Sequence, residues 1–144
     1  VLELCPDSVH LRASWMYDLP GYGLPIRGNL PLNLLRAALK GEAVRFSRND
    51  FRGVTYVRQV IENLEPAMDL PGGVYNFGSG NAEDMVCTAR QFAKALDITV
   101  KITEESWERN LVMDAAKLER SGIRFAATQQ GIRCCLQDYG LSDL

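Results

Sequence analysis

The sequence contains very little histidine and no repeated cysteine spacing, and these two absences exclude several kinds of site. His10 is its only histidine, and its four cysteines form no Cys-x-x-Cys pair. A zinc site needs three or four ligands at short, regular spacings. A Ser-His-Asp triad needs a histidine, for which the chain offers His10 alone. We therefore assign no metal site and no catalytic residue to this chain.

The chain also lacks long apolar runs and a strong net charge. No stretch approaches the roughly 18 apolar residues that cross a bilayer, and no signal-peptide pattern is present. Because the formal net charge is −2, neither nucleic acid nor a membrane surface is expected as a partner. Free cysteines are typical of a reducing compartment, which predicts a cytoplasmic protein. The 144 residues, 47% of them hydrophobic, predict a single globular domain, 1–144.

Charge is distributed unevenly along the chain. The first 60 residues hold eight basic and five acidic side chains, whereas residues 61–105 hold three basic and eight acidic ones. The basic excess is concentrated in four arginines: Arg45, Arg48, Arg52 and Arg58. Such a group could bind an anionic ligand. The alternative is that these arginines cover a solvated face.

Hydrophobic periodicity predicts alternating strands and helices. Alternation of apolar and polar residues predicts four strands, over 9–14, 44–47, 73–77 and 98–102. Apolar spacings of three and four predict five helices: 29–40, one from Val57 ended by Pro66, one after 78–81, a short one capped by Asp114 and a last one capped by Thr128. This order predicts an α/β fold.

One glycine-rich turn, Gly78-Ser79-Gly80, stands between a predicted strand and a predicted helix, as a phosphate-binding loop would. A dinucleotide fingerprint needs a third glycine three residues further on, where this chain has Glu83. Glu83 and Asp84 already complement the dipole of the following helix and would repel phosphate. We interpret the turn as structural and predict no cofactor-binding residue in the chain.

Residues 11–18, Leu-Arg-Ala-Ser-Trp-Met-Tyr-Asp, carry a family resemblance. They resemble the Leu-Arg-x-Ser-Trp-x-Tyr-Gly segment of the dTDP-4-dehydrorhamnose reductase branch of the extended short-chain dehydrogenase/reductase family. The resemblance continues in register at 29–30, 53–59, 73–77, 114–118 and 121–123, so that it covers about residues 9–140. Four positions depart from the family pattern, and they concern the sugar pocket more than the fold: Asp18, Val54, Gln59 and Glu108.

The resemblance implies the C-terminal part of such an enzyme, with two strands of the Rossmann sheet and a small mixed α/β substrate-binding subdomain. The family's glycine-rich cofactor loop and its Tyr-x-x-x-Lys pair have no counterpart in this sequence. The chain therefore resembles the substrate-binding portion, cut just after the catalytic lysine. It would not be catalytic alone, and NAD(P) would be the cofactor of the intact parent, an NAD(P)-dependent sugar-nucleotide reductase or epimerase.

The same resemblance implies which residues bind a dTDP- or UDP-sugar. Arg52 and Arg109 fall where the family directs arginines toward the nucleotide diphosphate. Trp15 is expected near the sugar ring, Asn29 as a polar contact and Tyr56 as a further substrate-binding residue. The alternative is that both arginines are surface residues, paired with the neighbouring acids Asp50 or Glu108.

A second function remains open at this stage. The segment from Arg52 to Val57 is similar to the Arg-x-Pro-Thr-x-Val element of the methionine adenosyltransferase regulatory subunit, which implies a non-catalytic regulatory or binding module. In either case, strands 9–14 and 73–77 would lack their neighbours in the sheet, leaving unpaired edges and an apolar face that includes Leu11, Val74 and Tyr75. We therefore predict self-association of the isolated chain.

Overall fold

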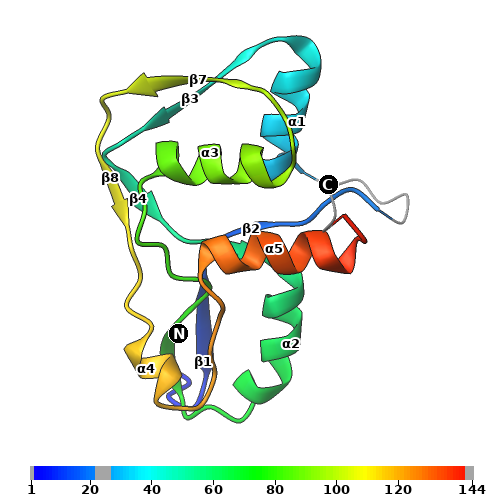
Figure 1. Ribbon diagram of the computed structural model, residues 1–144. Helices are drawn as coiled ribbons and strands as arrows, with labels where there is room; N and C mark the ends of the chain where they lie inside the picture. Colours follow the sequence, from blue (N-terminus) through cyan, green and yellow to red (C-terminus); the bar gives the residue numbers. More distant parts are fainter. Residues whose placement is uncertain (1, 22–26, 142–144) are drawn as a thin grey trace.

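The computed structural model describes residues 2–21 and 27–141, an elongated α/β arrangement of short strands and helices (Figure 1). The helices are α1 (Leu30–Lys40), α2 (Val57–Ala67), α3 (Met85–Ala95), α4 (Ala116–Glu119) and α5 (Thr128–Asp138). The strands are β1 (Val9–Ala13), β2 (Trp15–Tyr17), β3 (Ala43–Ser47), β4 (Asp50–Arg52), β5 (Val54–Tyr56), β6 (Gly73–Phe77), β7 (Lys101–Glu105) and β8 (Arg109–Leu111). The predicted α/β class is confirmed.

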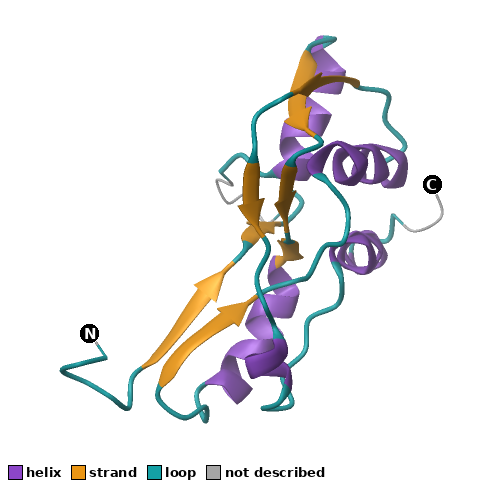
Figure 2. Cartoon of the chain, turned by 90° about the vertical axis from the view of Figure 1, so that its left-hand side faces the viewer, coloured by secondary structure: helices purple, strands orange, loops and turns teal. Residues whose placement is uncertain are grey.

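The strands form four parallel pairs rather than one continuous sheet. β1 pairs with β6, β2 with β5, β3 with β7 and β4 with β8. Figure 2 shows the pairs following one another along one side of the molecule, with helices on the other. Parallel strands need a long crossover connection, so each pair brings together segments that lie far apart in the sequence.

Helix α1 begins and ends as its sequence predicts. The Asn29 side chain accepts a hydrogen bond from the Leu32 backbone N–H at 3.0 Å, and Gly41 ends the helix with φ 65°. Asparagine is among the best N-cap residues, and glycine adopts a left-handed conformation without steric cost. Leu30 and Leu34 are fully buried on the inner face. The predicted helix over 29–40 is confirmed.

Helix α3 ends in a motif that shifts the next strand. Asp97 has φ 50°, and the Ile98 N–H donates to the Ala93 carbonyl at 3.0 Å while the Asp97 N–H donates to Lys94. This is a Schellman motif, and it uses the backbone N–H with which the predicted strand over 98–102 would begin. The bounds of that prediction are wrong, because β7 starts at Lys101.

Three predicted helix boundaries also differ from the structure. The N-cap of α4 is Ala115 and not Asp114. Pro66 lies inside the last turn of α2, and the helix ends one residue later, at Ala67. The proline removes one backbone donor close to the helix end, where little of the hydrogen-bond ladder is left to break. Thr128 is the first residue of α5 rather than its cap, and its buried hydroxyl accepts from the Val54 N–H at 3.0 Å. The threonine therefore ties α5 to β5.

Buried apolar residues form two clusters. The larger one joins α1, α3 and α5 to β2 and β5, and its central contact is an edge-to-face pair of Tyr17 and Phe92 with ring centroids 5.2 Å apart. The smaller one lies under β6 and α4 and includes Tyr75 and Phe77. Burial of Tyr75 corrects the predicted apolar face of β1 and β6, since Val74 is exposed there and Tyr75 is not. Within the described ranges, no helix is long and apolar enough to cross a membrane.

Candidate functional site

The β4–β8 pair positions the charged side chains of the site. Its parallel register places Asp50 opposite Arg109 and Arg52 opposite Leu111. The preceding pair, β3–β7, aligns Val44 with Ile102. The pairing of 43–47 with 101–105 lies shortly before both arginines and brings the segments that carry Arg52 and Arg109 side by side.

A cleft of about 330 Å³ lies where β1 and β4 end. It is lined by residues 12–15, 52–53 and 110–113, and we call it the arginine cleft. Arg52 and Trp15 stack on each other in its wall, with the guanidinium carbon 4.4 Å from the centroid of the indole ring. A cation over an indole face is a favourable electrostatic contact. This contact holds the Arg52 side chain over Trp15.

Arg52 is the most constrained cation of the cleft. Its side chain is 19% exposed, and its Nε is buried without a hydrogen-bond partner among the described residues. Burial lowers the pKa of Arg52 from its ordinary value, an effect that nearby Asp50 opposes and nearby Arg109 reinforces. A guanidinium remains protonated in proteins. The cleft therefore contains a fixed positive charge with one N–H donor to spare.

Asp50 joins the two arginines. Its side chain is 1% exposed, and its Oδ2 lies 3.5 Å from Arg52 Nη2 and 3.8 Å from Arg109 Nε. The same oxygen accepts from the indole N–H of Trp107 at 3.5 Å. Two cations around one carboxylate leave one positive charge in excess. The contacts are long, so the guanidinium groups keep donors available for a second anion.

Tight backbone packing supports the cleft from below. At Gly53 a Cβ would collide with the carbonyl oxygen of Ser79, so only glycine permits this approach. The Arg52 carbonyl accepts from the Asn81 side-chain amide at 3.0 Å. The same amide donates to the Thr88 hydroxyl of α3 at 2.9 Å. The end of β4 is thus anchored to the 78–81 turn and to α3.

The structure brings three of the five predicted substrate-binding residues together. Trp15 and Arg52 line the arginine cleft, and Arg109 lies beside it, 44% exposed and in contact with Asp50. Asn29 lies elsewhere: its amide caps α1 and donates to the Asp18 carbonyl at 2.9 Å. Tyr56 is buried in the larger core, its ring stacked on that of Tyr17.

The four arginines in the basic part of the sequence do not assemble into one patch. Arg48 pairs with Glu104 at 2.7 Å, and Arg58 pairs with Glu62 at 2.9 Å. Both pairs are exposed, where such contacts contribute little to stability. Among these four, Arg52 alone lines the arginine cleft. The second arginine at the site is Arg109, which comes from a different segment of the chain.

From the sequence, Asp50 was expected only as a surface ion-pair partner of the arginines, and Trp107 was not expected at the site. One signal for Asp50 was present in the sequence: Asp50 and Arg52 are two residues apart, and side chains at i and i+2 of a strand share a face. No local signal could place Trp107, because its contact with Asp50 spans 57 residues of sequence. Both tryptophans of the chain, Trp15 and Trp107, flank the site.

The Gly78–Gly80 turn does not fit the pyrophosphate of a dinucleotide. Ser79 is buried and its N–H already donates to the Thr55 hydroxyl at 2.7 Å. At the start of α3, Asp84 accepts from the Cys87 N–H at 2.8 Å and occupies the place that an anion would take. In the described part of the chain, no group of three or more His, Cys, Asp or Glu side chains is placed to hold a metal ion.

Comparison with solved structures identifies the fold. The dTDP-4-dehydrorhamnose reductase of Bacillus anthracis, solved in complex with NADP, superimposes with a TM-score of 0.76 at 14% identity, over 92% of this chain and 48% of that one. The UDP-glucose 4-epimerase of Thermus thermophilus, in complex with NAD, gives 0.66 at 21% identity, over 92% and 46%. The UDP-N-acetylglucosamine 4-epimerase of Methanobrevibacter ruminantium, in complex with UDP-N-acetylmuramic acid, gives 0.66 at 18%, over 96% and 47%.

These likenesses show that the chain has the fold of the C-terminal part of extended short-chain dehydrogenases, as the resemblance predicted. The chain spans about half the length of the solved proteins that it matches. No protein-family model matches it, and no curated protein matches its sequence. At identities this low the comparison establishes the fold and leaves the activity to be proposed.

Proposed function

We propose that this chain is the nucleotide-sugar-binding portion of an NAD(P)-dependent sugar-nucleotide reductase or epimerase, and that the arginine cleft binds the diphosphate. One observation carries the proposal. Trp15, Arg52 and Arg109 come from three distant segments and lie close together: both arginines contact the buried carboxylate of Asp50, and Trp15 stacks on Arg52. The fold likeness to solved enzymes whose names include dTDP-4-dehydrorhamnose reductase and UDP-glucose 4-epimerase supports it.

The two arginines have complementary roles in this proposal. Arg52 is held in place by Trp15 and Asp50, and its unpartnered Nε donates to a phosphate oxygen. Arg109 is more exposed, so its guanidinium can reach a second phosphate oxygen while its Nε stays beside Asp50. Guanidinium groups bind phosphate oxygens in pairs through parallel N–H donors. The sugar lies nearer to Trp15, whose ring offers an apolar surface to a pyranose.

The oxidoreductase chemistry is assigned to the intact parent and not to this chain. The sequence has no Tyr-x-x-x-Lys pair, and the Gly78–Gly80 turn does not fit a dinucleotide. Bound NAD(P) would supply or accept a hydride in the parent. The residues of this chain bind and orient the sugar nucleotide.

Calorimetric titration of the full protein with dTDP-glucose and with UDP-glucose tests the proposal. A charge-assisted hydrogen bond is worth about 1.5–3 kcal/mol, so Arg52→Ala or Arg109→Ala should weaken binding by about 10- to 150-fold. Arg45→Ala is the matched control, because Arg45 is an exposed arginine of β3 outside the cleft. Affinities equal to wild type in both cleft variants, or a wild-type protein that binds neither sugar nucleotide, would refute the assignment.

Self-association belongs to the same proposal. β1 and β6 form an isolated two-stranded pair, and Val74 on β6 is exposed. A strand without a neighbour on one side offers free backbone donors and acceptors to another chain. Light scattering of the isolated chain should give a mass above 16.1 kDa that rises with concentration. A constant monomer mass at high concentration contradicts this expectation.

A further inference from the structure

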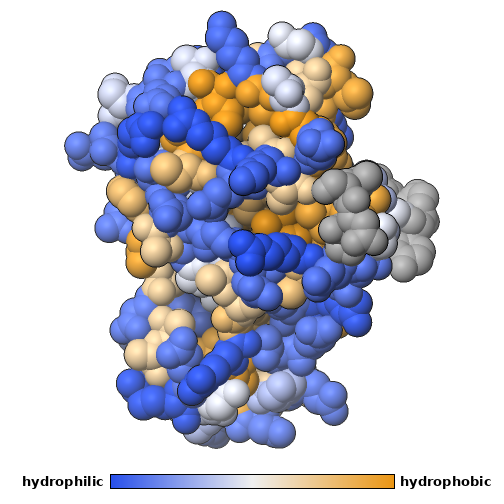
Figure 3. Space-filling view, in the orientation of Figure 1, coloured by the Kyte–Doolittle hydropathy of each residue, from blue (hydrophilic) through white to orange (hydrophobic). Residues whose placement is uncertain are grey.

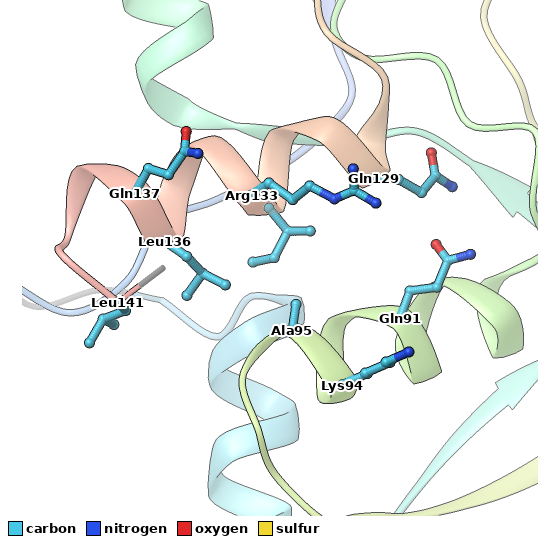
Figure 4. A pocket seen from close by; sticks show the side chains of 9 residues that line it. Gln91, Lys94, Ala95, Gln129, Arg133, Leu136, Gln137 and Leu141 are labelled. Atoms are coloured by element: carbon cyan, nitrogen blue, oxygen red, sulfur yellow. The ribbon is translucent and has the colours of Figure 1, made fainter. Parts of the chain in front are cut away.

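A second cleft, of about 540 Å³, lies between α3 and α5 (Figure 4). We call it the α3–α5 cleft. Its volume is in the range of small-molecule sites. Figure 2 shows that α3 and α5 lie on the opposite side of the molecule from β1. A partner that extended the β1–β6 pair would therefore leave this cleft accessible.

One end of the α3–α5 cleft is polar and positively charged. Figure 4 shows the side chains of Gln91, Lys94, Gln129 and Arg133 gathered at this end. No acidic side chain is among the described residues that line the cleft. Neither Lys94 nor Arg133 forms an ion pair with another described residue. Two uncompensated cations at one end favour an anionic group there.

The same end contains an acceptor without a donor. Gln91 Oε1 is buried and has no hydrogen-bond partner within the described part of the chain. Gln129 donates instead to Asn81 Oδ1, at 2.7 Å. Buried polar atoms are nearly always satisfied. A ligand that brings an N–H or O–H close to its anionic group would satisfy this oxygen.

The other end of the cleft is mostly apolar, with Gln137 at its border. Leu136 and Leu141 lie there, with Ala95 between the two ends (Figure 4). In Figure 3 hydrophobic surface is visible in the hollow above α5, bordered by hydrophilic side chains. Covering such a surface is favourable in water. The cleft thus joins a cationic end, an unsatisfied acceptor and an apolar end.

We propose that the α3–α5 cleft binds a small amphipathic carboxylate of the N-acyl amino acid type. The carboxylate pairs with Lys94 and Arg133, the amide N–H donates to Gln91 Oε1, and the apolar side chain covers Leu136 and Leu141. This site is independent of the sugar-nucleotide site, since the two clefts share no lining residue.

Three small probes separate the elements of this recognition in an NMR chemical-shift titration of the full chain. N-acetyl-L-leucine carries the carboxylate, the N–H and the apolar side chain. N-acetyl-L-leucinamide lacks the charge, and 4-methylpentanoate lacks the N–H. N-acetyl-L-leucine should saturate shifts confined to α3 and α5, with a dissociation constant of roughly 1 mM. The uncharged amide should bind at least about 10-fold more weakly, and 4-methylpentanoate about 3- to 10-fold more weakly.

Three variants, one of them a control, assign the contacts. Lys94→Ala/Arg133→Ala should abolish saturable binding, whereas Lys101→Ala/Arg120→Ala removes the same charge outside the cleft and should bind as wild type does. Gln91→Leu should bind N-acetyl-L-leucine and 4-methylpentanoate equally, with unchanged affinity for the latter. The inference is overturned if wild type shows no saturable shifts in α3 and α5, if both double variants lose binding equally, or if Gln91→Leu keeps the preference.

Discussion

The arginine cleft and the α3–α5 cleft both present cations, but they hold them differently. In the arginine cleft a buried carboxylate, Asp50, lies between Arg52 and Arg109, and Trp15 covers one guanidinium. In the α3–α5 cleft the two cations have no ion-pair partner among the described residues. Preorganised charges bind a ligand without first being ordered, whereas flexible side chains lose rotamer entropy on binding. The difference predicts a selective site and a weaker, more permissive one.

The two clefts also differ in how they depend on the rest of the fold. The arginine cleft is built at strand ends, where the contact between Asp50 and Arg109 joins β4 to β8. The cations of the α3–α5 cleft project from the surfaces of helices whose inner faces are already packed. The charges of the arginine cleft therefore contribute to the stability of the fold. The charges of the α3–α5 cleft contribute to ligand binding and not to stability.

Removal of Asp50 should have the largest effect on this comparison. Asp50→Ala leaves Arg52 partly buried beside Arg109 without its counter-charge, and breaking a buried ion pair costs about 3 kcal/mol or more. We expect the free energy of unfolding to fall by about that amount in urea denaturation. Lys94→Ala/Arg133→Ala should change it by less than about 0.5 kcal/mol, since it alters exposed side chains. Equal losses in the two variants would contradict the distinction between the clefts.

The ligand affinities of the two clefts should also depend differently on salt, and this difference is smaller than the difference in stability. Added salt screens exposed charges more than partly buried ones. Between about 0.05 and 0.5 M NaCl, we expect the affinity of the arginine cleft for a sugar nucleotide to fall about 3-fold. The affinity of the α3–α5 cleft for N-acetyl-L-leucine should fall about 10-fold. Titration calorimetry measures the affinity of the arginine cleft, and NMR measures that of the α3–α5 cleft. A steeper salt dependence at the arginine cleft would contradict the interpretation of Arg52 as a shielded cation.

Cysteine reactivity should show whether the α3–α5 cleft exists before ligand binds. Cys135 of α5 is buried, and burial raises the pKa of its thiol to about 12, with a smaller effect from Asp18. At pH 8 the thiolate that reacts with iodoacetamide is therefore scarce, and mass spectrometry should find exposed Cys5 alkylated long before Cys135. Similar alkylation rates would mean that α5 leaves the core and that the cleft is not preformed.

The raised pKa of Cys135 has a further consequence for stability against pH. The neutral thiol is favoured in the folded chain, so its contribution is complete below the ordinary thiol value of 9.0 and is lost as pH rises toward about 12. Wild type should therefore lose more stability than Cys135→Ala across this interval. Parallel pH profiles in urea denaturation would show that Cys135 does not report the packing of α5.

Much of the secondary structure could be predicted, because its determinants lie within a few residues of one another. Asn29 and Gly41 bound α1 through a side chain and a backbone conformation at its own ends. The buried face of α3, including Met85 and Phe92, follows from apolar spacing. Four strands of only three residues each were missed, since so short a run shows no periodicity: β2, β4, β5 and β8.

The sequence by itself determined the α/β class, the helices with the two caps of α1 and, through the family resemblance, the expectation that Arg52 and Arg109 lie close together. The tertiary structure alone decided that Asp50 lies between these arginines, that Thr128 bonds to β5 rather than capping α5, and that α3 and α5 leave a cleft between them. The physical reason is the sequence separation over which each interaction acts. Caps and periodicity act over three or four residues, whereas parallel pairing and helix packing join segments whose register no local pattern encodes.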